Sequence, residues 1–108
     1  YAAHVGTKLI LVLGHTGCGA IKGAIDDVKL GNLTGLLAKI HPAIEAASCS
    51  SSKDDACVTK VAVKNVLQSM KEIREGSPYL KKYLDEGKVE LVGALYDVAT
   101  GKVTFMEN

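Results

Sequence analysis

The sequence lacks any apolar run long enough to cross a membrane. Its longest such run, residues 9–13, falls far short of the roughly twenty residues that a spanning helix needs. No signal-peptide pattern of basic, apolar and small residues opens the chain. We therefore expect no membrane partner. Because the chain begins at Tyr1, without methionine, and residues 1–5 resemble the last turn of a helix, we expect a fragment or a processed product.

The sequence also lacks an excess of charge of either sign. Thirteen basic and twelve acidic side chains are scattered along it and give a formal net charge of +1. A protein that follows a phosphate backbone needs a basic stripe or patch, and none is present. We therefore expect no nucleic acid partner.

Cysteine is scarce, and the number of cysteines is odd. Cys18, Cys49 and Cys57 are too few for a disulfide scaffold. This count is more typical of a reducing compartment or of metal binding than of secretion, so we expect a cytoplasmic protein.

The 108 residues, of which 47% are hydrophobic and 23% charged, suit one compact domain over residues 1–108. Residues 8–13 form a nearly continuous apolar run, typical of a central strand that is covered on both faces of a parallel sheet. Residues 89–96 and 103–106 are β-rich and predict a terminal hairpin. The order of strand, helices and two strands predicts an α/β fold: a mostly parallel sheet flanked by helices, with an antiparallel C-terminal edge strand.

Helical patterns fill the middle of the chain. Residues 20–28 are expected to be helical, and residues 33–44 carry apolar side chains at helical spacing, although Pro42 should kink or interrupt that helix. Residues 48–55 predict a serine-rich surface loop. A long helix is expected over residues 58–75, and the sequence Ser77-Pro78 should begin another.

Three glycines in residues 14–19 make the segment after the first strand a candidate binding loop. A P-loop would need lysine and a hydroxyl residue where Ala20 and Ile21 stand, so that motif fails. A dinucleotide fingerprint would need a glycine where Lys22 stands, so that motif fails too. Phosphate binding is therefore not expected.

Metal binding is the third possibility for this loop. His15 and Cys18 are two residues apart on a flexible segment, and imidazole nitrogen with thiolate sulfur is a pair of ligands that zinc favours. No second cysteine stands at C-x-x-C spacing from Cys18, which argues against a redox motif. The spacing alone leaves open that His15 caps a turn and that Cys18 is a small buried hydrophobe.

The residues around this pair carry a resemblance to a known family. Residues 11–20, Leu-Val-Leu-Gly-His-Thr-Gly-Cys-Gly-Ala, closely resemble the strand and loop of β-class carbonic anhydrases that present the H-x-x-C half of the zinc site. Asn65-Val66, Ser77-Pro78, Gly87-Lys88-Val89, Gly93-Ala94-Leu95-Tyr96-Asp97 and Thr100-Gly101-Lys102-Val103 are similar to the family's later helices and strands, in the same order. The resemblance covers nearly the whole chain.

The resemblance implies a zinc enzyme that interconverts carbon dioxide and bicarbonate. In that family zinc is held by two cysteines and one histidine from C-x-D-x-R and H-x-x-C, and by the aspartate or a water. His15 and Cys18 match the second motif, and the backbone of Gly19 could bind substrate or orient the thiolate. The resemblance also implies a homodimer or a higher even oligomer.

The first motif of the family is missing. C-x-D-x-R occurs nowhere in the 108 residues, so the catalytic aspartate and arginine cannot be assigned. Catalytic zinc usually has three protein ligands and one open position. We therefore expect this chain alone to bind zinc weakly and to be inactive, with truncation as the explanation. The alternative is a non-catalytic zinc-binding or interaction module of the same fold.

The remaining candidate ligands are expected to have ordinary roles. Cys49 and Cys57 flank the serine-rich loop and are interpreted as surface or half-buried thiols, with an exposed disulfide and a four-ligand zinc site with His15 and Cys18 as alternatives. His4 and His41 are expected to be solvated or satisfied within the core, and Asp26-Asp27 and Asp54-Asp55 are expected to be solvated surface pairs.

Overall fold

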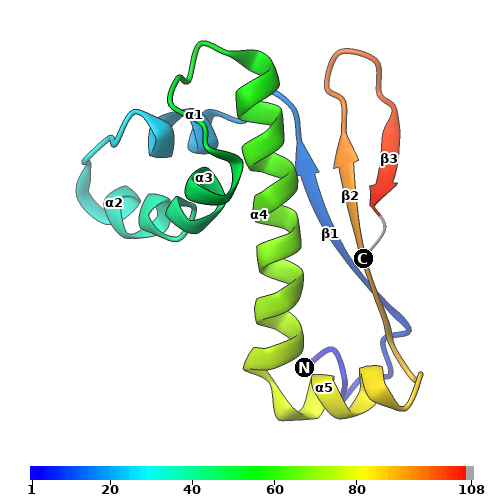
Figure 1. Cartoon of the computed structure of the whole chain (residues 1–108). Coiled ribbons are helices and arrows are strands. Elements are labelled where there is room, and N and C mark those ends of the chain that lie inside the picture. Colours follow the sequence, from blue (N-terminus) through cyan, green and yellow to red (C-terminus); the bar gives the residue numbers. More distant parts are fainter. Residues whose placement is uncertain (107–108) are drawn as a thin grey trace.

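A computed structural model describes residues 1–106 of the chain, so the last two residues of the predicted domain, 107–108, lie outside the described part. Its elements follow the order expected from the sequence (Figure 1). They are β1 (Leu9–His15), α1 (Gly19–Ile25), α2 (Gly31–Ala38), α3 (His41–Ala47), α4 (Asp55–Gly76), α5 (Pro78–Asp85), β2 (Glu90–Tyr96) and β3 (Val103–Met106).

The three strands form one mixed sheet in the order β1-β2-β3. β1 and β2 are parallel, with Leu9 opposite Glu90 and His15 opposite Tyr96. β3 pairs antiparallel with β2 as the second strand of the expected hairpin. The predicted α/β class and the antiparallel C-terminal edge strand are therefore confirmed.

The prediction that the first strand is central and covered on both faces is wrong for the described residues. β1 lies at an edge of the sheet, and its side chains alternate between half-buried and exposed. Leu9, Leu11 and Leu13 are 53%, 45% and 50% exposed. Strand alternation places them on the face opposite α4. The apolar run thus has the composition of a doubly covered strand, but the described chain covers only one face.

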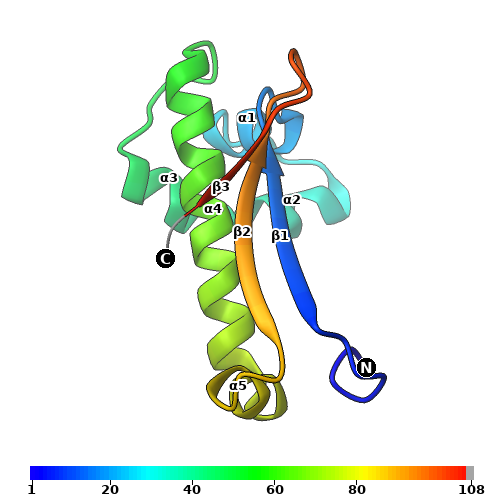
Figure 2. The same ribbon diagram turned by 90° about the vertical axis from the view of Figure 1, so that its right-hand side faces the viewer.

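The uncovered side of the sheet is called the bare sheet face below. The register of the three strands places side chains from each of them on this side. They include Leu9, Leu11, Leu13, His15, Tyr96, Val103 and Phe105. In Figure 2 the helices lie behind β1 and β2, and no helix lies in front of them. An apolar face of this kind normally marks an interaction surface.

Helix α4 lies between the sheet and the cluster formed by α1, α2 and α3 (Figure 1). Its first turn is capped by Asp54, whose carboxylate accepts a hydrogen bond from the Cys57 amide at 3.2 Å. One part of the core joins α4 to α1–α3, and the other joins Val66 and Met70 of α4 to Leu91 of β2. Asp54, expected only to be solvated, therefore has a structural role.

The helical pattern of residues 33–44 is divided between two helices. α2 ends at Ala38, and α3 begins at His41 with Pro42 in its first turn. Proline fits that position because the first amides of a helix have no intrahelical acceptor. α1 ends at Ile25, before the expected end at residue 28, because Asp27 adopts a left-handed conformation with φ of 58°.

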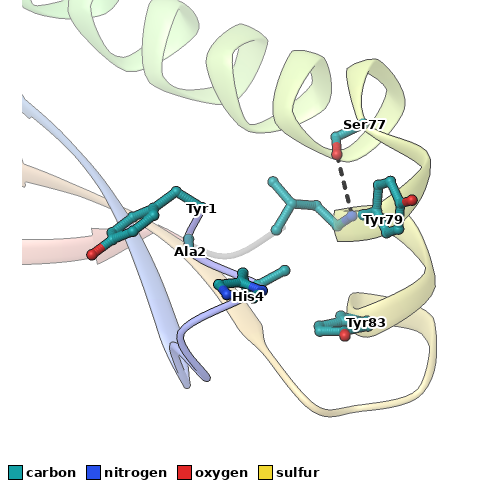
Figure 3. A pocket seen from close by; sticks show the side chains of 8 residues that line it. Tyr1, Ala2, His4, Ser77, Tyr79 and Tyr83 are labelled. Carbon is teal, nitrogen blue, oxygen red and sulfur yellow. Dashed lines mark hydrogen bonds between the residues drawn. The ribbon is translucent and has the colours of Figure 1, made fainter.

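Helix α5 begins at the predicted Ser77-Pro78 signal. The Ser77 hydroxyl accepts a hydrogen bond from the Leu80 amide at 3.3 Å, as Figure 3 shows. We predict that Ser77→Ala lowers the free energy of unfolding by about 1 kcal/mol because this amide loses its partner. Urea denaturation of both proteins measures the difference, and Ser77→Asp should retain most of the wild-type stability. Equal stability of Ser77→Ala and the wild type would show that the cap contributes nothing.

No helix in residues 1–106 has both the length and the apolar character that a membrane span requires.

Candidate functional site

The predicted site lies where β1 ends and α1 begins. His15 is the last residue of β1, and Cys18 is the N-cap residue of α1, so only Thr16 and Gly17 separate the two elements. β2 ends beside His15 because the two strands are parallel and in register. The carboxyl ends of parallel strands are where α/β sheets bind ligands.

The imidazole of His15 is held by its own loop. Its Nδ1 atom lies 2.8 Å from the carbonyl oxygen of Thr16. A carbonyl oxygen can only accept a hydrogen bond, so Nδ1 must carry the proton in this contact. The lone pair of the neutral ring is then on Nε2. Metal-binding histidines commonly have this arrangement, in which a backbone carbonyl fixes the tautomer.

Thr16 anchors the loop to the far end of the chain. Its amide donates to the carbonyl oxygen of Tyr96 at 3.0 Å, and its hydroxyl accepts from the Val98 amide at 3.1 Å. Gly17 then turns the chain with φ of +62°, a conformation that side chains with a Cβ rarely adopt. Sequence reasoning missed Thr16, because its partners are about eighty residues away and follow no local pattern.

Cys18 is a free, half-buried cysteine. It caps α1 through its carbonyl, which accepts from the Lys22 amide at 3.1 Å, while its side chain makes no capping hydrogen bond. The sulfur is thus left available to a ligand. The amide of Gly19 follows directly and belongs to the first turn of α1, whose amides have no intrahelical acceptor. This geometry is compatible with the expected orienting role of the Gly19 backbone, which stays a prediction.

His15 and Cys18 line one pocket of about 240 Å³. Its floor is apolar and includes Ile21, while Asn65 and Ser69 of α4 add polar groups. These two residues are one helical turn apart, so they project from the same side of α4. The four-residue spacing of Asn65 and Ser69 is visible in the sequence. That both line the pocket beside His15 is visible only in the structure.

The described residues supply two candidate ligands and no more. Across residues 1–106, no three histidine, cysteine, aspartate or glutamate side chains gather closely enough to hold a metal ion. His15 and Cys18 fit zinc in their chemistry, since they are an imidazole with a free Nε2 and a free thiol at the border of one pocket. That His15 and Cys18 bind zinc stays a prediction.

The prediction that Cys49 and Cys57 are separate thiols is wrong. They form a disulfide, with their Cα atoms 5.5 Å apart, and Cys49 is only 8% exposed. The serine-rich loop folds back because α3 and α4 pack together, which the sequence alone did not indicate. Since bonded sulfurs are not thiolates, the alternative of a four-ligand zinc site with His15 and Cys18 is excluded in this state.

A larger hollow lies elsewhere in the described chain. It has a volume of about 530 Å³ between the first four residues and α5, and its lining includes His4, Tyr79 and Tyr83 (Figure 3). This is the end where the parallel strands begin, opposite to His15 (Figure 1). The position of the strand ends and the ligand chemistry therefore favour the smaller pocket as the functional one.

Asp26 and Asp27 are exposed, as expected, and His41 is half-exposed. His41 Nε2 lies 3.8 Å from a carboxylate oxygen of Asp27, which also pairs with Lys29 at 3.0 Å. Asp26 accepts a hydrogen bond from the Ser52 hydroxyl. These contacts lie outside the pocket that contains His15.

Comparisons with known proteins show what the chain is similar to. The sequence profile of a family described as carbonic anhydrase matches residues 1–103. The chain is 30% identical to a carbonic anhydrase of Candida albicans over 105 residues, which cover 93% of this chain and 37% of that protein. It is 25% identical to a carbonic anhydrase of Pseudomonas aeruginosa over 109 residues, 97% of this chain and 49% of that protein.

Solved structures show the same fold. A crystal structure from a study of two tetrameric β-carbonic anhydrases of Sordaria macrospora superposes with a TM-score of 0.85 at 23% identity, covering 99% of this chain and 56% of that one. The chain therefore spans less than half the length of the two relatives above and little more than half of this structure.

Proposed function

Because the chain belongs to the carbonic anhydrase family and has the fold of solved β-carbonic anhydrases, we propose that it forms part of a β-class zinc enzyme that interconverts carbon dioxide and bicarbonate. The observation that supports this most is the pairing of two zinc-type ligands at one pocket, His15 with its Nε2 free and Cys18 with a free sulfur. Both lie at the carboxyl end of a parallel strand.

Each residue of the loop has a part in this proposal. His15 Nε2 and Cys18 Sγ would hold the zinc ion. Zinc, when bound, supplies a Lewis acid that activates water for attack on carbon dioxide. Thr16 holds the loop through its carbonyl contact with His15, through one hydrogen bond to Tyr96 at the end of β2 and through a second to Val98, just after β2. Asn65 and Ser69 supply polar groups at the pocket wall.

The proposed site is completed by residues outside those described. His15 belongs to the bare sheet face, and among the described residues β1 pairs with β2 alone, which leaves its other edge open. We propose that further polypeptide covers this face and brings the missing ligand to zinc. The relatives contain enough unmatched length to do so. The 108 residues alone should therefore have little or no activity.

An assembly with an even number of subunits accords with this proposal. The Sordaria macrospora enzymes are described as tetrameric, and the bare sheet face of this chain offers apolar area from three strands.

A second candidate function is a non-catalytic zinc-binding or interaction module of the same fold. The observation in its favour is that residues 1–106 contain only two of the three protein ligands that catalytic zinc usually has. The coding sequence on the 5′ side of the Tyr1 codon separates the two. A C-x-D-x-R motif there favours the enzyme, and a native start near Tyr1 favours the module.

Stopped-flow carbon dioxide hydration tests the enzyme directly. We predict that His15→Ala, in the longest natural product that contains this chain, lowers kcat/KM by more than about 100-fold, because a ligand of the catalytic metal is lost. His41→Ala is the matched control, since it removes a histidine that is paired only with surface Asp27. A His15→Ala protein that hydrates carbon dioxide at the parental rate would rule out the catalytic role.

A further inference from the structure

The Cys49–Cys57 disulfide joins two helices next to the candidate zinc loop. Cys49 follows the left-handed Ser48 at the end of α3, and Cys57 lies in the first turn of α4. The Cα separation of 5.5 Å falls in the range of native disulfides. The bond closes a short loop, residues 49–57, over the end of α4 nearest the candidate site.

The disulfide and Cys18 share one part of the core. Cys49 is buried in the cluster that contains Ile21 and Ala24 of α1, and both Cys57 and Cys18 pack against this cluster. All three cysteines of the chain therefore contact the same group of side chains. The disulfide and Cys18 are therefore linked through one packed cluster.

The disulfide loop also holds the other end of α1. The Ser52 hydroxyl donates a hydrogen bond to a carboxylate oxygen of Asp26 at 2.9 Å, and Asp26 is the C-cap residue of α1. α1 is thus fixed between the candidate ligand Cys18 at its start and the disulfide loop at its end. A helix of seven residues has little stability of its own, so these outer contacts determine how firmly it is held.

We propose that Cys49–Cys57 is a reducible redox site that controls how rigidly α1 holds Cys18, and thereby the affinity of the His15–Cys18 site for zinc. The zinc part of this inference rests on the proposed function, whereas the effect on α1 does not. The reductant is a dithiol, either a small molecule or a protein with two neighbouring thiols.

The chemistry is thiol–disulfide exchange. A thiolate of the dithiol attacks one sulfur of the pair, the Cys49–Cys57 bond breaks, and a mixed disulfide forms. The second thiol of the reductant then displaces the protein sulfur. Two electrons and two protons pass to the protein, which gains two thiols, and the dithiol becomes a disulfide. Cys57 is the more accessible of the two residues, because it is half-buried while Cys49 is buried.

Reduction of the folded chain is the first measurement. The 108-residue chain is titrated with dithiothreitol without denaturant, new thiols are alkylated, and the products are identified by mass spectrometry, with circular dichroism recording the fold. We expect Cys49 and Cys57 to be reduced while the helical signal persists. A bond that is reduced only when the chain unfolds would overturn the proposal.

Amide hydrogen exchange tests the coupling to α1 without metal. In Cys49→Ser/Cys57→Ser, the amides of residues 16–26 are expected to exchange about tenfold faster than in the oxidised wild type, because local opening becomes easier. Ser52→Ala is a milder variant that keeps the disulfide. It should accelerate amide exchange at the C-terminal end of α1 alone. Faster exchange restricted to residues 48–57 in the double variant, with α1 unchanged in both, would refute the coupling.

Zinc titration completes the test. Reduction of the disulfide, or the double serine variant, should weaken zinc binding about tenfold, as expected when the support of a ligand is removed. Equal affinity of the oxidised and reduced chains would contradict control of the site. If the oxidised chain binds no zinc while the exchange result holds, the proposed zinc site fails and the coupling between the disulfide and α1 remains.

Discussion

Replacing Cys18 with serine is expected to abolish the sulfur-to-metal charge-transfer absorption that the wild-type chain develops when it is titrated with cobalt(II), a spectroscopic substitute for zinc. Cys18 is the one thiol available, because the other two cysteines of the chain are bonded to each other. Any thiolate absorption must therefore come from this residue. Loss of the band together with a metal affinity lower by about 100-fold would identify Cys18 as a ligand.

His15→Ala should weaken cobalt binding to a similar degree while a residual thiolate band persists at high metal concentration. His41→Ala serves as the control, because it removes no proposed ligand, and it should retain both the band and the metal affinity. Cys49→Ser/Cys57→Ser should retain the band at saturating cobalt, with an affinity about tenfold lower. An unchanged cobalt spectrum in Cys18→Ser would show that the metal is bound elsewhere.

Gly93→Ala is expected to lower the free energy of unfolding by about 3 kcal/mol, at the upper end of the cost of overpacking a core. Gly93 lies in β2 directly beneath α4, where an added Cβ would approach Met70 Sδ to 2.6 Å and Val66 Cγ1 to 2.9 Å. Met70 can change rotamer, but Val66 is β-branched and stiff. The helix must then move away from the sheet. Chemical denaturation measures the loss.

Two further variants make this prediction specific. Val66→Ala removes one of the colliding groups, so the double variant Gly93→Ala/Val66→Ala should be about 1 kcal/mol more stable than the sum of the single effects predicts. Gly35→Ala, in α2, is the matched control: a Cβ there meets nothing within 4 Å, and alanine should stabilise the helix slightly. If the changes in the free energy of unfolding caused by Gly93→Ala and Val66→Ala were additive, close packing of α4 on Gly93 would be disproved.

Local sequence signals predicted most of the fold. The apolar run before the glycines gave β1, the periodic apolar residues gave α4, and Ser77-Pro78 gave the start of α5. The residues 103–106 matched β3 in full. These signals work because propensity, capping and periodicity act over a few residues, within one element.

Features that depend on distant parts of the chain could not be predicted. The hydrogen bond from the Val98 amide to the Thr16 hydroxyl joins residues from opposite ends of the sequence. The disulfide requires α3 and α4 to pack side by side, and the spacing of Cys49 and Cys57 alone is also compatible with free thiols. The candidate ligands His15 and Cys18 were found because they are close in sequence and resemble a known motif.

The error about β1 is informative in itself. Its continuous apolar composition indicates a strand with cover on both faces, yet Leu9, Leu11 and Leu13 are half exposed. The proposal that further polypeptide packs against the bare sheet face would account for this composition. Because the same face contains His15, it would also account for the missing zinc ligand.

The most direct measurement of the central claim is X-ray absorption at the zinc edge of the zinc-loaded chain. The account predicts one sulfur scatterer at about 2.3 Å and one imidazole nitrogen at about 2.0 Å, with the sulfur lost in Cys18→Ser and the imidazole signal lost in His15→Ala. A zinc shell of oxygen and nitrogen alone in the wild type, or one that neither substitution changes, would contradict it.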